Sequence, residues 1–329
     1  MTDSQTRSFV SSRSADVWHD IREPNSSEVW CYCALSDDGE ELVLVKFHDN
    51  YRASPKFYAT NGVFRRIPAV EFTYLNNGRV VARSFCEYLG EDFVASRSDA
   101  TVSISNNKIS GENAAYGNGH VVNIDLPASR KRRIKATIEW LSIETNLADS
   151  KDLAATNIVT PRADVSGKIS ILKGKVENAI SFRGTGTHSH RIITGEFEPI
   201  TFAGCVHFAD ATAIIESVDQ NTIILTVLTD GVIESHELAL QTKTDGVNTY
   251  GLSYPRNVVY ASKTVSLELS RRTMITSMPY GSAFLSDVTL KLGETREKHS
   301  SGIFEFTDNT RMRHTFWRKL SGMRIRKGI

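Results

Sequence analysis

Two histidines separated by a single residue, His188 and His190, form the most suggestive pair of chemical groups in the sequence. A strand-like run, Val176–Phe182, precedes them. Alternate side chains of a strand share a face, so we expect the two imidazoles to lie side by side on one wall of a sheet. Gly184 and Gly186, just before them, would allow a bulge or a close approach of another segment to the backbone.

Such an imidazole pair can hydrogen bond a substrate, ligate a metal ion or satisfy polar groups in a core. A metal ion would need a third ligand, for which His207, Glu196 and Glu216 are the candidates. No spacing in the sequence places any of them near the pair. We therefore predict no metal ion and keep His188 and His190 as catalytic candidates, with a structural role as the alternative.

A second group of candidates, Glu28, Trp30 and Tyr32, shares one face of another predicted strand. They predict either a pocket wall with a carboxylate and a phenol as hydrogen-bonding groups, or an aromatic core strand with Glu28 at its exposed start. If Glu28 is buried, its pKa should rise, which would suit a general acid. His207 lies in an apolar strand, either as a satisfied core histidine or as a substrate-binding residue.

The elements that must position these residues are almost all strands, because nearly every periodic segment alternates with period two. Asp38-Gly39 and Asn77-Gly78 each predict a hairpin turn. The best helix signal is in the tail, at Thr310–Leu320. The strands are too many for one eight-stranded barrel, so we predict an all-β protein with two β-barrel domains and a short C-terminal helix. The expected parts are a disordered leader (1–17), an N-terminal barrel domain (18–183) and a C-terminal barrel domain with a basic tail (184–329).

Composition excludes several classes of function. A net charge of +1 over 329 residues gives no global attraction to nucleic acid. No apolar run reaches the roughly 18–20 residues of a membrane-spanning helix, and the polar start lacks the core of a signal peptide, so we predict a cytoplasmic protein. Gly184-x-Gly186 lacks the third glycine of a dinucleotide-binding loop. The basic tail Arg311–Lys327 favours either a capping helix with solvated charges or peripheral contact with an anionic membrane.

Several short motifs, taken together, resemble the carotenoid 1,2-hydratase (hydroxyneurosporene synthase) family. Glu28–Gly39 resembles that family's opening Glu-Trp-Trp-Tyr-Phe-x-Ala-x-Ser-Asp-Asp-Gly, and Ser54-Pro55-x-Phe57-Tyr58 resembles the Ser-Pro-x-Tyr that follows. Gly184–His190 stands where the family has Gly-x-Gly-Tyr-His-Asp-His-Asn-Trp-Gly. The C-terminal pieces that match are Leu252–Arg256, Gly302–Phe306 and Met323–Ile325. The order and spacing of these motifs run from about residue 24 to residue 327.

The resemblance implies two lipocalin-like barrels that bind a greasy polyene or terpenoid. Some relatives hydrate a terminal alkene of a carotenoid, and others are Diels–Alderases that close a decalin ring. No redox cofactor is implied, and we expect none. The substrate-binding residues that the resemblance and the strand faces suggest are Trp30, Tyr58, Thr187, Ser189 and His207, beside the catalytic candidates His188, His190, Glu28 and Tyr32.

The chain departs from the family motif after its glycines: Thr187 replaces Tyr, Ser189 replaces Asp, and Arg191-Ile192-Ile193 stands in place of Asn-Trp-Gly. Alkene hydration needs an acid that can protonate carbon, which a serine cannot do. The leading hypothesis is therefore an enzyme that promotes a redox-neutral cyclisation of a hydrophobic polyene, terpenoid or polyketide, as a Diels–Alderase does. Hydration of an alkene, with Glu28 as the acid, and a non-catalytic carrier of a hydrophobic ligand are the alternatives. The sequence does not predict the oligomeric state.

Overall fold

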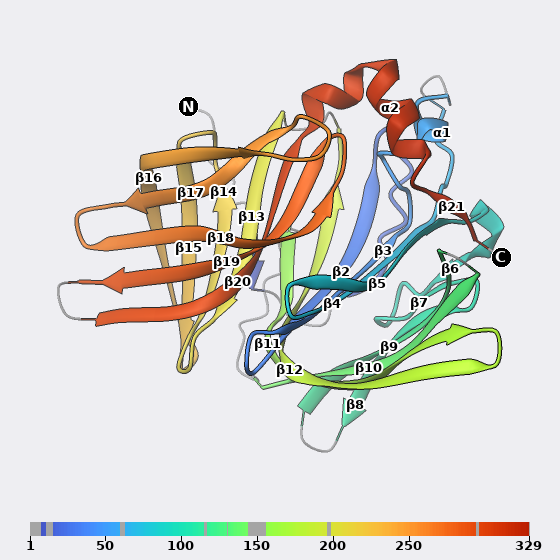
Figure 1. Ribbon diagram of the computed structural model, residues 1–329, viewed down its shortest axis with the longest axis horizontal. Helices are drawn as coiled ribbons and strands as arrows, with labels where there is room; N and C mark the ends of the chain where they lie inside the picture. Colours follow the sequence, from blue (N-terminus) through green and yellow to red (C-terminus); the bar gives the residue numbers. More distant parts are fainter. Residues whose placement is uncertain are drawn as a thin grey trace. The chain divides into compact units, whose positions relative to one another are not determined.

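The computed structural model is almost entirely β, which confirms the predicted fold class (Figure 1). It describes residues 8–10, 16–59, 63–114, 117–129, 131–143, 156–195, 199–293 and 296–328. The chain divides into two compact units, one formed by Met1–Glu196 with Gly322–Ile329 and the other by Phe197–Ser321. Each unit has its own sheet and its own apolar core.

The first unit is built on a 13-stranded sheet that curls around its core. Its strand order is β21-β5-β4-β3-β2-β12-β11-β10-β9-β8-β7-β6, with β1 pairing on β11. The curl brings β5 back to β9, where the Ser84 hydroxyl donates a hydrogen bond to the Pro127 carbonyl (2.5 Å). Its elements before the second unit are β1 (Ser8–Val10), β2 (Ser27–Ser36), β3 (Glu41–His48), α1 (Pro55–Tyr58), β4 (Ala69–Asn76), β5 (Arg79–Glu87), η2 (Gly90–Asp92), β6 (Phe93–Ala95), β7 (Val102–Ile104), β8 (Asn107–Ala114), β9 (Gly117–Ala128), β10 (Arg132–Ser142), β11 (Thr156–Lys173) and β12 (Val176–Ile193).

Alternation of apolar and polar residues explains these strands. In β10, Ile134 and Trp140 are buried in the core, whereas Lys135 between them is exposed. One face of the strand therefore packs in the core and the other faces solvent. The predicted hairpin turn between β4 and β5 is also present. Asn77 and Gly78 both adopt positive φ, at 48° and 69°, as a two-residue hairpin turn of this kind requires.

The second unit is a closed eight-stranded barrel, β13 to β20 in sequence order (Figure 1). Phe202, Phe284 and Phe304 stack in its core, with ring centroids 5.6 to 6.4 Å apart. The barrel strands are β13 (Ile200–His207), β14 (Thr212–Ser217), β15 (Thr222–Thr229), β16 (Val232–Val247), β17 (Ser253–Ala261), β18 (Val265–Ser277), β19 (Gly281–Leu292) and β20 (Arg296–Asp308).

The basic tail forms the predicted helical segment as two pieces, η3 (Asn309–Arg313) and α2 (Thr315–Gly322), followed by β21 (Arg326–Lys327). One basic side chain of the tail binds within the protein, since the Arg311 guanidinium donates hydrogen bonds to the carbonyls of Tyr250 (3.0 Å) and Gly251 (2.6 Å). Among the helices that the structure describes, none has the length and apolar character needed to cross a membrane.

The division between the units differs from the predicted boundary at residues 183 and 184. β12 runs unbroken through that point, where Gly184 pairs with Val165 of β11 and with Ser36 of β2. Gly184 and Gly186 are interior residues of this strand, and the division falls after Glu196.

The predicted disordered leader is also corrected where it is described. Residues 1–7 and 11–15 lie outside the described residues. Ser8–Val10 forms β1 in parallel with Thr156–Ile158 of β11, and Asp16 is completely buried. A polar composition suggested a solvated segment, but Asp16 finds buried polar partners in the first unit.

Candidate functional site: a buried histidine and carboxylate cluster

The pairing of β12 with β2 builds the centre of the site. His188 lies opposite Tyr32 in the register, and His190 lies opposite Trp30. The Tyr32 and His188 rings stack with centroids 3.9 Å apart and planes inclined by 3°. Trp30 and His190 stack at 4.5 Å and 16°. All four side chains have an exposed fraction of 0%, so the histidines share one face as their spacing predicts and are sealed within the core.

Gly186 makes room for the aromatic wall of this site. A Cβ at that position would lie 2.7 Å from Nε1 of Trp140 and 2.6 Å from the Cys33 carbonyl oxygen. The missing side chain therefore lets the Trp140 indole lie close against β12. From there Trp140 contacts the edge of Tyr32, with ring centroids 5.1 Å apart.

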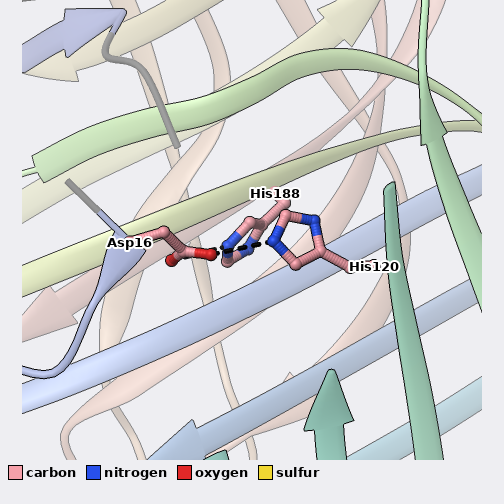
Figure 2. Close-up of side chains that lie close together, drawn as sticks. All are labelled: Asp16, His120 and His188. Atoms are coloured by element: carbon pink, nitrogen blue, oxygen red, sulfur yellow. Dashed lines mark hydrogen bonds and ion pairs between the residues drawn. The ribbon is translucent and has the colours of Figure 1, made fainter. Parts of the chain in front are cut away.

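Asp16, from the segment ahead of β2, joins two histidines from different strands (Figure 2). Its Oδ1 lies 3.0 Å from Nε2 of His188 on β12, and its Oδ2 lies 2.9 Å from Nε2 of His120 on β9. Burial alone would raise the pKa of Asp16. The charges and hydrogen bonds of His188 and His120 outweigh burial and hold that pKa well below its ordinary value, so Asp16 is a carboxylate.

The hydrogen-bond pattern of His188 calls for a positive group between it and Asp16. Nδ1 of His188 lies 3.1 Å from the Cys31 carbonyl oxygen, which only accepts, so Nδ1 carries a hydrogen. In a neutral ring, Nε2 would then present a lone pair to a carboxylate oxygen at 3.0 Å. A proton or another cation must therefore lie between Nε2 and Asp16.

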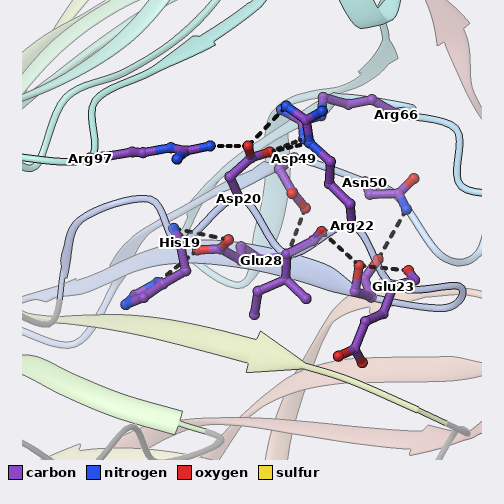
Figure 3. Close-up of polar contacts among 11 residues, drawn as sticks. His19, Asp20, Arg22, Glu23, Glu28, Asp49, Asn50, Arg66 and Arg97 are labelled. Carbon is purple, nitrogen blue, oxygen red and sulfur yellow. Dashed lines mark hydrogen bonds and ion pairs between the residues drawn. The ribbon is translucent and has the colours of Figure 1, made fainter.

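Glu28 forms the second polar group of the cluster, at the start of β2 (Figure 3). Its Oε2 lies 3.0 Å from Nδ1 of His19 and 3.2 Å from Nε2 of His190. The backbone N–H of His19 also donates to both carboxylate oxygens, at 3.1 Å each. Nδ1 of His190 lies 3.7 Å from Oδ1 of Asp16 and so links the two groups.

The expectation that burial would turn Glu28 into an acid is wrong. Glu28 is buried, and burial does oppose its ionisation, but the hydrogen bonds of His19 and His190 prevail and lower the pKa of Glu28 to about 2. Glu28 is therefore a carboxylate at neutral pH and has no proton to give.

The neighbouring carboxyl group of Asp49, and not that of Glu28, retains its proton. Asp49 follows β3, is 1% exposed, and accepts a hydrogen bond at its Oδ1 from the backbone N–H of Glu28 (2.7 Å). Burial raises the pKa of Asp49 to about 7, and the nearby charge of Glu28 acts in the same direction. No pattern in the sequence distinguished Asp49 from other turn residues.

Four of the predicted site residues do not join this cluster. Thr187 and Ser189 alternate with the histidines and so face the other side of the sheet, where the Thr187 hydroxyl donates to the Pro161 carbonyl (3.1 Å). The identity of residue 189 therefore does not decide the chemistry of the cluster. Tyr58 ends α1 and packs on Phe57. His207 belongs to the second unit and hydrogen bonds the Thr212 hydroxyl (3.1 Å).

The sequence did not reveal three members of the cluster, namely Asp16, His19 and His120. Asp16 and His120 are 104 residues apart along the chain. The one local signal was the motif Asp16-x-x-His19 just ahead of a predicted strand, and its first residue lay in the segment 1–17 whose composition suggested disorder.

Two sets of side chains here have the composition of a metal site. Asp16, His120 and His188 form one, and His19, Glu28 and His190 form the other. In each set the three potential ligand atoms lie within 4.8 Å of one another. The two sets divide the pair, because His188 belongs to one and His190 to the other. His207 and Glu216 belong to neither set, and Glu196 lies outside the described residues.

No protein-family model and no curated protein sequence matches this chain. Solved structures do resemble it. CghA, in a crystal structure with Sch210972, superposes with a TM-score of 0.54 at 13% identity, over 87% of this chain and 89% of CghA. A putative AttH from Nitrosomonas europaea superposes with a TM-score of 0.58 at 8% identity, over 86% of this chain and 92% of the other.

A third structure, kievitone hydratase from Nectria haematococca, reaches a TM-score of only 0.47 at 12% identity, over 93% of this chain and 97% of that protein, and supports no argument here. The first two likenesses confirm the lipocalin-like architecture that the sequence motifs indicated. At identities this low they concern the fold alone.

Proposed function

We propose that this protein is an enzyme that binds a hydrophobic polyene, terpenoid or polyketide and promotes its redox-neutral cyclisation. The observation that carries the proposal is the position of the cluster: His188 and His190 lie within an apolar core face, stacked on Tyr32 and Trp30. A carbonyl of a greasy substrate that reached this face would meet polar groups in surroundings of low dielectric constant. There a hydrogen bond or a positive charge acts more strongly than it does in water.

The magnitudes favour cyclisation among reactions open to such a site. Holding a flexible substrate in its reactive conformation can lower a barrier by about 7–11 kcal/mol in the best cases. Polarisation of a carbonyl by one well-placed donor contributes about 3–4 kcal/mol. A pericyclic ring closure needs these two effects and no strong acid, which agrees with the ionised state of Glu28.

The comparison with CghA supports this proposal by analogy. CghA is a Diels–Alderase with the same architecture. The analogy supplies the reaction class, whereas the residues named for this chain come from its own cluster.

The test is to incubate the purified protein with a hydrophobic extract of its native host and to follow the extract by mass spectrometry. Cyclisation gives a product of unchanged mass with a new retention time, whereas hydration adds the mass of one water. His188→Ala and His190→Ala should slow formation of the isomer by about 10²-fold, the effect of losing one polarising group. His299→Gln, on an exposed side chain of the second unit, is the matched control. Wild-type turnover in both alanine variants would refute the proposal, and binding of an unchanged lipid would favour a carrier.

Hydration remains the second candidate because of one observation, the buried carboxyl group of Asp49 beside the start of β2. With its pKa raised to about 7, Asp49 retains a proton to donate where Glu28 has none. A product heavier by one water, formed by the wild type and lost in Asp49→Asn, would select hydration over cyclisation.

A further inference from the structure

We propose that Asp16, His120 and His188 form a binding site for a divalent metal ion of the zinc class. The three side chains come from the segment ahead of β2, from β9 and from β12, and their ligand atoms converge on one point in the core of the first unit (Figure 2). The site itself is independent of the proposed function. The role that we give the ion, as a Lewis acid, rests on it.

The distances are of the size found between the ligands of a metal ion. Bonds of about 2.0–2.1 Å to zinc in a tetrahedral arrangement place neighbouring ligand atoms about 3.3 Å apart. Here Oδ1 of Asp16 lies 3.0 Å from Nε2 of His188, and Oδ2 lies 2.9 Å from Nε2 of His120. The two contacts use different oxygens, so an ion between the imidazoles would meet both oxygens of the carboxylate, or one of them after the carboxylate has turned.

The contacts around His188 are those of a metal ligand, whereas Nδ1 of His120 is buried without a hydrogen-bond partner among the described residues. A histidine that binds a metal through one nitrogen usually donates its other N–H to a carbonyl or carboxylate, and a ligating carboxylate is usually held by a further polar group. Nδ1 of His188 meets the Cys31 carbonyl oxygen at 3.1 Å, which leaves Nε2 as the ligand. Nδ1 of His190 lies 3.7 Å from Asp16 Oδ1, which is beyond hydrogen-bond distance.

The side-chain partners of the two buried acidic residues give a further reason. Within the described part of the chain, neither Asp16 nor Glu28 forms an ion pair with a lysine or arginine; their partners are histidines alone. A buried group made of carboxyl groups and imidazoles has the composition of a transition-metal site.

The set around Asp16 is the better candidate of the two. Both oxygens of Glu28 already accept hydrogen bonds from the His19 backbone N–H, at 3.1 Å each. The oxygens of Asp16 face side-chain nitrogens instead. Two imidazoles and one carboxylate suit zinc and its neighbours among the transition metals, whereas calcium and magnesium prefer oxygen ligands throughout.

Three protein ligands are the usual number in a catalytic zinc site, where the remaining position takes water or substrate. A conjugated carbonyl oxygen of the substrate would donate a lone pair to the ion, and this would draw electron density from the attached alkene. In the ring closure three π bonds become two carbon–carbon σ bonds and one π bond. No atom leaves, and no electron is gained or lost.

The experiment uses the full-length chain without an affinity tag, because a histidine tag would itself bind metal. Zinc content per chain is measured by mass spectrometry after gel filtration. Cobalt(II) is then titrated into chelator-treated protein while its visible absorption is recorded. The variants are Asp16→Asn, His120→Gln and His188→Gln, with His299→Gln as control, and circular dichroism checks that each is folded.

We expect one zinc or cobalt ion per chain, with the intense bands of a four-coordinate cobalt site. Each ligand variant should weaken binding by at least about 10-fold, and His299→Gln should bind like the wild type. A wild-type chain that binds neither ion, or folded ligand variants that bind as the wild type does, would overturn the site. Cyclisation that persists after chelation would refute the Lewis-acid role and leave the proposed function intact. Metal binding without any cyclisation would refute the proposed function together with the Lewis-acid role and leave the metal site intact.

Discussion

Tyr32 and His188 lie directly opposite each other in the pairing of β2 with β12, and their rings are parallel within 3° at a centroid distance of 3.9 Å. Opposed residues of an antiparallel pair are close enough for their side chains to interact on one face. Here that contact joins an aromatic wall to a polar cluster, because the other edge of His188 reaches Asp16. Tyr32 therefore both packs the core and fixes the plane of the imidazole.

Tyr32→Leu should lower the free energy of unfolding by about 2–4 kcal/mol. The loss combines a cavity left by the phenol with the loss of three ring contacts, to His188, His120 and Trp140, and such pairs contribute about 0.5–1.5 kcal/mol each. Tyr32→Phe keeps all three ring contacts and should cost about 1 kcal/mol at most. Denaturant unfolding of the three proteins measures this, and equal losses in both variants would show that the rings contribute nothing.

Gly186→Ala should disturb both Trp140 and the pairing of β12 with β2. The new Cβ would lie 2.7 Å from the indole nitrogen and 2.6 Å from the Cys33 carbonyl oxygen, too close for real atoms, so both must move away from it. Overpacking of this kind costs about 1–3 kcal/mol, and the tryptophan emission should shift. Gly90→Ala is the control, because the nearest atom to its Cβ would be 3.3 Å away. Unchanged emission in Gly186→Ala would mean that the indole does not depend on the glycine.

The features of the site that the sequence predicted are those that depend on a period of two. His188 with His190, and Trp30 with Tyr32, share a face because alternate residues of any strand do, whatever the strand packs against. The hairpin turn at Asn77-Gly78 was predictable for the same local reason, since its residues tolerate positive φ.

The cluster itself depends on contacts that no local pattern encodes. Asp16 meets His188 across 172 residues of chain, and the pairing of β2 with β12 is equally remote. Gly184 and Gly186 were expected to allow a bulge or a close approach, and Trp140 does approach Gly186 closely. The predicted boundary at residue 183 differs from the observed division after Glu196, because the number of strands does not say which of them share a sheet. Asp16 was placed in a disordered leader because the prediction rested on the average polarity of residues 1–17. An average does not identify the single polar residue that is buried.

Asp20 should hold the segment that carries Asp16 and His19. Its carboxylate accepts hydrogen bonds from Arg22 and Arg66, at 2.9 Å each, and from Arg97 (Figure 3). Asp20→Asn removes the charge but little volume, so we expect a loss of about 1–2 kcal/mol in unfolding free energy. Faster hydrogen exchange in residues 16–20 should accompany it. Asp37→Asn, in the exposed turn after β2, is the control. Unchanged hydrogen exchange in Asp20→Asn would show that Asp20 does not hold residues 16–20 in place.

Asp49 and Glu28 should give stability opposite dependences on pH. Glu28 has a pKa of about 2 in the folded protein against an ordinary 4.5, so its contribution is present above pH 4.5 and is lost as the pH falls towards 2. Asp49 has a pKa raised from 3.8 to about 7, so the folded protein holds a proton that the unfolded chain releases. Stability should therefore fall as the pH rises from about 4 to 7, and by about 2–4 kcal/mol in all.

Asp49→Asn separates the two effects, because an amide stays neutral and its oxygen can still accept from the Glu28 backbone N–H. The variant should match the wild type near pH 4 and exceed it in unfolding free energy by about 2–4 kcal/mol at pH 8. Glu28→Gln should remove part of the wild-type loss above pH 4, because the charge of Glu28 helps to raise the pKa of Asp49. Denaturant unfolding at a series of pH values measures all three proteins. If wild type and Asp49→Asn show parallel profiles from pH 4 to 8, then Asp49 is already ionised in the folded protein, and the acid on which hydration depends does not exist.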